Sequence, residues 1–312
     1  MRRLRHPLLL ALCLAFTGSA AFAWDGFGHQ VIARIAWENL RPETRARAIA
    51  LLRAAPADAD LASLLPDDGR PLAERERTLF ERAATWPDIV RDEAFAERNA
   101  TYHHGSWHYV NHFWEQDANG RPLDVDRLRP QDVNVVERLH ALEVSVADPG
   151  REAAQRGVDL AWILHLGGDI HQPLHTSARV TATEPEGDRG GNLFKLATEK
   201  DDLHWYWDCL LSKAYPRRGQ ESEAEQIERV VGKLQRRHPR TSFVGQLEPG
   251  RYEAWVQTGL ALSKTEVYRG VERGKAPGRR YEKKAIRIAV PRIALAGYRL
   301  AEILERSLGA AR

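Results

Sequence analysis

Cysteine is nearly absent from this chain, which has two, Cys13 and Cys209, among 312 residues. Cys13 lies in a leader-like segment that we expect to be removed, so an intrachain disulfide is excluded in the mature protein. A chain of this length can do without one, because it can bury a substantial hydrophobic core. Cys209 lies in an apolar helical segment and is more typical of a core residue than of a nucleophile.

Long apolar runs are also missing, apart from "PLLLALCLAF" near the N-terminus, which is too short to span a bilayer as a mature helix. Three arginines precede this run, and the small residues "AFA" follow at positions 21–23. The pattern predicts a secretory signal peptide over residues 1–23, cleaved before Trp24. An uncleaved membrane anchor is the alternative. We expect an exported protein of residues 24–312, periplasmic or secreted, with no membrane partner.

The mature chain has little net charge of either sign. The formal charge of the whole chain is +3, and the expected leader holds three arginines and no acids, so residues 24–312 are formally neutral. No general excess of basic residues could hold a polyanion. Any attraction for phosphate must come from charge concentrated at one site.

The alternation typical of β-strands is scarce, and "WHYVNHFW" at residues 107–114 is the main candidate for an extended segment. Elsewhere apolar residues recur three and four positions apart. Neither an internal repeat nor a convincing linker is present. The sequence therefore predicts one all-α domain, and we expect Pro291 to open its last helix.

One stretch, "HLGGDIHQPLH" at residues 165–175, concentrates metal-ligand side chains. His165 and Asp169 are four residues apart, which places them one turn apart on a helix face. Pro173 should end the helix and let His175 turn back toward the same region. A single pair of this kind is usually an ordinary helix-surface pair.

A second pair favours a metal site over an ordinary helix-surface pair, because His204 and Asp208 repeat the spacing in the Trp-rich segment "LHWYWD". Imidazole and carboxylate together suit zinc. The segment "HHGSWHYVNH" also carries His104, His108 and His112 at helical spacing. If it is extended instead, the three stand far apart and at most one or two could be ligands.

These motifs together resemble the S1/P1 nuclease family, the secreted, zinc-dependent, single-strand nucleases. The resemblance covers nearly all of residues 24–312, through "WDGFGHQVIARIA", "TWPDIVR", "WHYVN", "HLGGDIHQPLH", "GDRGGN", "LHWYWD" and "LAGYRLAEIL". It implies a single mainly helical domain built around a trinuclear zinc site, an architecture shared with zinc phospholipase C.

The resemblance also implies three Zn²⁺ ions and nine ligand residues. The ligands are Asp88, His108, His165 and Asp169 for the first zinc, Trp24 (α-amine and carbonyl), His29 and the bridging Asp169 for the second, and His175, His204 and Asp208 for the third. Three aspartates return three of the six positive charges, so the cluster keeps a formal +3 that could attract phosphate. A water bridging the paired zincs would have its pKa lowered toward about 7 and serve as nucleophile.

Other residues near these ligands are expected to support them. His171 is not a ligand in the family, and we predict a structural or supporting role for it. Gly167 and Gly168 are expected to allow the close approach of another backbone.

The chain departs from the fungal members of the family at positions beside the metals. Where those enzymes pair an Asp with a Lys, this chain has Asn111 and, less clearly aligned, Arg91. Asn111 cannot accept a proton as a carboxylate would, so we predict that this pair orients bound water or phosphate while Asp169 positions the nucleophile. Tyr109 stands at the family's aromatic position and would stack on an unpaired base, although packing beneath the site is its alternative role. Asn192 is a weaker substrate-binding candidate.

The resemblance implies hydrolysis of single-stranded DNA and RNA to 5′-phosphate products, with activity on 3′-nucleotides. A zinc-dependent phospholipase C is one alternative, and an exported zinc-binding protein without catalysis is another. Asp208, where a glutamate would favour the lipase, supports the nuclease, and three protein ligands on the third zinc leave a position open for catalysis. We expect a monomer with no obligate protein partner.

Overall fold

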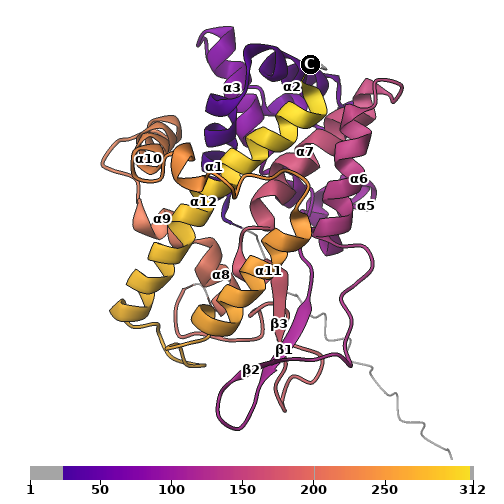
Figure 1. Ribbon diagram of the computed structural model, residues 1–312. Helices are drawn as coiled ribbons and strands as arrows, with labels where there is room; N and C mark the ends of the chain where they lie inside the picture. The colour runs from indigo at the N-terminus through magenta and orange to yellow at the C-terminus, as the bar shows by residue number, and fades with distance from the viewer. Residues whose placement is uncertain (1–23, 200, 310–312) are drawn as a thin grey trace, which may run out of the picture.

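The computed structural model describes residues 24–199 and 201–309, and helices make up most of this part of the chain (Figure 1). The helices are α1 (Gly26–Asn39), α2 (Pro42–Ala54), α3 (Leu72–Ala83), α4 (Trp86–Ile89), α5 (Ala96–Tyr102), α6 (Val135–Ala147), α7 (Ala153–Asp169), α8 (Leu203–Asp208), α9 (Leu210–Ala214), α10 (Glu223–Arg237), α11 (Tyr252–Leu262) and α12 (Arg279–Leu308). The prediction of a mainly helical single domain is confirmed. The predicted signal peptide, residues 1–23, lies outside the described residues.

The long helix α12 organises the core. It runs diagonally through the molecule in Figure 1, and both α1 and α7 pack against it. A Cβ at Gly297 would lie only 2.5 Å from Cβ of Ile35, so glycine is needed where α1 and α12 cross. This contact sets the position of α1 relative to the C-terminal part of the chain.

The expectation that Pro291 opens the last helix is wrong, because α12 begins at Arg279 and contains Pro291 in its interior. An interior proline removes one helical hydrogen bond and costs about 3 kcal/mol. Buried residues continue on both sides of it, including Ala285, Ala289 and Ile293. Packing of this continuous apolar face offsets the local penalty.

A small sheet with strand order β2-β1-β3 lies at the end of the molecule away from α2 and α3 (Figure 1). Its strands are β1 (His112–Gln116), β2 (Pro122–Asp124) and β3 (Ser177–Arg179). The segment expected to be extended, residues 107–114, is extended only in part: it begins in the 3₁₀ turn η4 (Gly105–His108) and ends within β1. Strand β1 pairs in parallel with β3, and just before it Val110 N donates to His175 O at 2.8 Å. The sheet therefore places the chain after His108 beside His175.

The remaining expectations about the core hold. Cys209 is buried, as expected of a core residue. Within residues 24–199 and 201–309, no helix combines the length and the apolar character needed to cross a membrane.

Candidate metal centre

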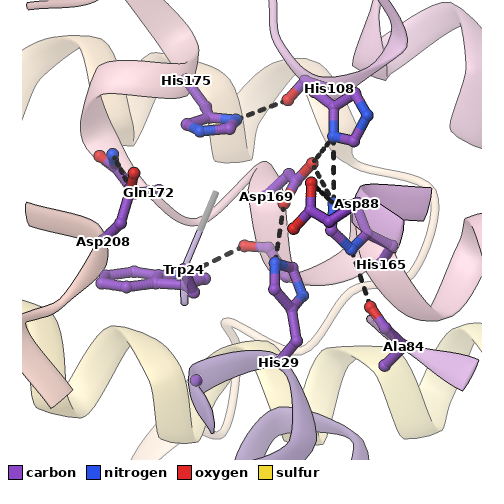
Figure 2. Close-up of polar contacts among 12 residues, drawn as sticks. Trp24, His29, Ala84, Asp88, His108, His165, Asp169, Gln172, His175 and Asp208 are labelled. Carbon is purple, nitrogen blue, oxygen red and sulfur yellow. Dashed lines mark hydrogen bonds and ion pairs between the residues drawn. The ribbon is translucent and has the colours of Figure 1, made fainter. Parts of the chain in front are cut away.

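Eight of the predicted ligand side chains meet in one largely buried region, and all of them except His204 are labelled in Figure 2. They come from α1, α4, η4, α7, the 3₁₀ turn η5 (Pro173–Thr176) and α8. Their ligand-type atoms gather into three groups, each with all atoms within 4.8 Å of one another: His29, His165 and Asp169; Asp88, His108 and His165; His175, His204 and Asp208. We call the first two groups the α7 cluster and the third the α8 cluster.

Asp169 lies at the middle of the α7 cluster, and its two oxygens face different neighbours. Its Oδ2 lies 3.0 Å from His108 Nδ1 and 3.2 Å from His165 Nε2. Its Oδ1 lies 3.3 Å from His29 Nε2. This is the arrangement that a carboxylate needs in order to bridge two metal ions.

Backbone carbonyls fix the tautomers of three histidines. The Nδ1 atoms of His165, His175 and His204 each lie 2.7 Å from a carbonyl oxygen, those of Ala84, His108 and Gly190. A carbonyl only accepts, so each Nδ1 carries a proton, and in the neutral ring each Nε2 presents a lone pair. The Nε2 atoms of His175 and His204 are 3.0 Å apart. Two lone pairs at that distance repel each other unless a cation lies between them.

Several buried polar atoms of the centre also make no hydrogen bond within the described part of the chain. His29 Nε2, His108 Nε2, Asp169 Oδ1 and Asp208 Oδ2 have no hydrogen-bond partner among the described residues. Buried polar groups are rarely left in this state. Nitrogen and oxygen donors in this mixture are the ligands that zinc prefers, so the residues present fit a multinuclear zinc site.

A family model for the S1/P1 nucleases matches residues 24–309. The chain belongs to the S1/P1 nuclease family. Endonuclease 2 of Arabidopsis thaliana is 24% identical over 326 residues, an alignment that covers 97% of this chain and 96% of that protein. Endonuclease 4 of the same plant is 25% identical over 225 residues, covering 67% of this chain and 62% of that protein. The chain is therefore a nuclease, a hydrolase of a metal-dependent family that cleaves ester bonds in nucleic acid.

The electrostatics of this nuclease suit metal binding. Burial lowers the pKa of His108 and of His204 to about 3, so both rings are neutral at physiological pH and available as ligands. Burial opposes ionisation of Asp169, but His165 and the hydrogen bond with His108 outweigh it and hold the pKa of that carboxyl well below its usual range. Burial raises the pKa of Asp208 well above its usual range. The Asp208 carboxylate therefore has too little positive charge around it to favour its ionised form, and a bound cation would supply that charge.

Trp24 lies at the edge of the α7 cluster. Its side chain is fully buried, and its indole Nε1 donates to Gly168 O at 3.1 Å. The first described residue therefore lies beside the end of α7, near His29. Its role as a ligand through the α-amine stays a prediction.

The expected close approach of a backbone at Gly167 and Gly168 is wrong, because side chains occupy that space. A Cβ at Gly167 would lie 3.0 Å from Leu300 Cδ1, and one at Gly168 would lie 3.0 Å from His29 Nδ1. The two glycines give room to α12 and to a candidate ligand. His171, which follows them, is buried and has its Nδ1 2.9 Å from Gly167 O.

The predicted substrate-binding residues differ in what they contact. Arg91 Nη2 is 3.3 Å from Asp88 Oδ1. Tyr109 directly follows His108, Asn111 lies three residues after it, and both are half-buried. Asn192 donates its side-chain amide to Arg189 O at 2.7 Å, within its own loop.

Of the three histidines spaced along "HHGSWHYVNH", the described structure brings only His108 into the metal groups. His104 stacks on Trp107 instead, with ring centroids 4.0 Å apart. Residues that the sequence did not single out also contact the centre, among them Ala84, Gln172 and Gly190. The position of Gln172 between the candidate ligands Asp169 and His175 was the only sequence signal for it.

Proposed function

We propose that this nuclease hydrolyses single-stranded DNA and RNA to 5′-phosphate products and also removes phosphate from 3′-nucleotides. The proposal is carried by one observation, the presence of three His/Asp groups, two of which share His165 and lie on either side of Asp169. The α7 cluster, with the terminal amine of Trp24, would hold two zinc ions and the α8 cluster a third. When bound, the zinc ions supply Lewis acidity and acidify water at neutral pH.

The residues of the chain position the reacting groups. Asp169 faces both halves of the α7 cluster with its two oxygens and so sets the spacing between them. The guanidinium of Arg91 offers only N–H donors and can donate to a phosphate oxygen. The amide of Asn111 can donate a hydrogen bond but cannot take up a proton. Both residues therefore bind and orient, and neither acts as a base.

Tyr109 supports the preference for single strands. Tyr109 is half-buried and directly follows the candidate ligand His108 in the sequence. Stacking on an aromatic ring tolerates any base but requires that the base be unpaired. A duplex would first have to expose a base at this position.

Export belongs to the same proposal. Removal of residues 1–23 would free the α-amine of Trp24, whose indole Nε1 donates to Gly168 O at the end of α7. We propose a monomer that acts in the periplasm or outside the cell.

The test uses the full chain, exported through its own leader, purified and assayed with and without chelator. The substrates are single-stranded DNA, duplex DNA, RNA, 3′-AMP and phosphatidylcholine. We expect chelator-sensitive cleavage of the single strands and of 3′-AMP, and weak cleavage of duplex. Tyr109→Ala should weaken binding of a dinucleotide while zinc content stays constant. Hydrolysis of phosphatidylcholine alone would indicate a phospholipase, and full zinc content without hydrolysis would indicate a binding protein.

A further inference from the structure

Gln172 lies in the turn between Asp169 and His175, is fully buried, and belongs to none of the metal groups. Its side-chain amide makes two hydrogen bonds. Leu174 N donates to Gln172 Oε1 at 2.6 Å, and Gln172 Nε2 donates to Asp208 Oδ1 at 2.8 Å. Figure 2 shows this amide directed at the Asp208 carboxylate.

The orientation of the amide follows from its partners. A backbone N–H can only donate, so the amide oxygen must face Leu174 and the amide NH₂ must face Asp208. The hydrogen bond engages Oδ1 and leaves Oδ2, which is buried and has no hydrogen-bond partner among the described residues. That free oxygen lies 3.7 Å from His204 Nε2. Gln172 thus determines which oxygen of Asp208 faces the histidine.

The same residue also sets the start of the turn that carries His175. Its side chain caps η5, and its carbonyl oxygen accepts from His175 N at 3.0 Å. Its own N–H donates to Asp169 O at 2.9 Å. Gln172 therefore holds two parts of the α8 cluster. Its side chain bonds the Asp208 carboxylate, and its backbone bonds the turn that carries His175.

We propose that Gln172 is a positioning residue for the zinc ion of the α8 cluster, acting through Asp208 and His175. The inference rests on the proposed function, in which this cluster binds zinc. Loss of a group that orients metal ligands lowers metal affinity by about 10- to 100-fold. We expect a loss of that size for this ion, with the two ions of the α7 cluster retained.

Two substitutions separate the hydrogen bonds. Gln172→Glu keeps an oxygen for Leu174 N but removes the donor and sets a second carboxylate against Asp208. Gln172→Met removes both bonds and adds no charge. The matched control is Gln226→Met, at a buried glutamine whose amide donates to Tyr215 O at 2.9 Å, in a contact that includes no metal residue.

The readout is zinc per chain after dialysis of each protein against a graded series of chelator concentrations, with circular dichroism as a check on folding. Both Gln172 variants should lose one of three ions at a chelator concentration that leaves the wild type and Gln226→Met intact. The lost activity should return with excess free zinc, because binding follows mass action.

Other outcomes overturn the inference in distinguishable ways. Zinc retention equal to that of the wild type, or simultaneous loss of all three ions, would show that Gln172 does not position this ion. A wild type with fewer than three zinc ions overturns the proposed metal set together with the inference. A wild type that holds three zinc ions but leaves nucleic acid intact contradicts only the proposed substrate, and the zinc readout still decides the role of Gln172.

Discussion

Gly190→Ala should damage the metal centre more than an alanine at any open glycine of the same conformation. Gly190 has φ of +60°, in the left-handed region, and its carbonyl oxygen lies 2.7 Å from His204 Nδ1. An added Cβ would overlap Leu174 O and lie 3.3 Å from His204 Nδ1. The methyl group would therefore push apart the two segments that carry the histidines of the α8 cluster.

The magnitude follows from two contributions. A non-glycine residue in the left-handed region costs about 1–2 kcal/mol, and overpacking of a tight site adds about 1–3 kcal/mol. Gly190→Ala should thus lower the free energy of unfolding by about 2–5 kcal/mol. Gly219 supplies the control, because it has φ of +49° and a Cβ there would meet nothing within 4 Å.

The assay is urea unfolding of both variants after chelator treatment, together with zinc content of the untreated proteins. Gly219→Ala should lose only the conformational part, about 1–2 kcal/mol, and keep its full zinc. Gly190→Ala should lose more stability and also zinc. Equal stability losses with equal zinc content would refute the reasoning, because the steric contact at Leu174 would then contribute nothing.

Three further predictions concern the same centre. Asp169→Ala should reduce activity more than Asp208→Ala in steady-state assays at matched folding, because Asp169 faces both halves of the α7 cluster; equal losses would argue against a bridging role. A retained Met before Trp24 should remove one zinc and most activity, measured against a chain processed at Ala23 and tagged at its C-terminus; full zinc in the extended protein would exclude the terminal ligand. Burial lowers the pKa of His204 to about 3 from 6.5, so the unfolded chain binds protons in that window that the folded chain does not. The free energy of unfolding of chelator-treated protein should therefore fall as pH drops from 6.5 toward 3 in a urea series, and a rise would contradict the assignment.

Local spacing predicted the parts of the site that are local. His165 and Asp169 share a helix face because four residues make about one turn, and the turn at Pro173 brings His175 back as expected. No spacing could bring His29 or Asp88 to α7, since those contacts depend on packing between distant elements. Only the family resemblance supplied them.

The errors have the same origin. Pro291 was expected at a helix start because local preference puts proline there, but the buried face of α12 overrides that preference. Strand β3 spans only Ser177–Arg179, which is too short for an alternating pattern to show. Gly167 and Gly168 correctly predicted that another group lies close to α7. The sequence did not show that this group is a side chain and not a backbone. Gln172 escaped notice because its partner, Asp208, is 36 residues away.

The packing of α1 and α7 on α12 has a consequence for the order of events during synthesis. These two helices carry His29, His165 and Asp169, yet the apolar faces that hold them in place are completed by α12, which is synthesised after them. Contacts between the two ends of a chain form late, because the intervening loop must close first. We therefore expect that the nascent chain cannot assemble its metal centre before α12 has been synthesised, so that the nuclease is inert up to that point.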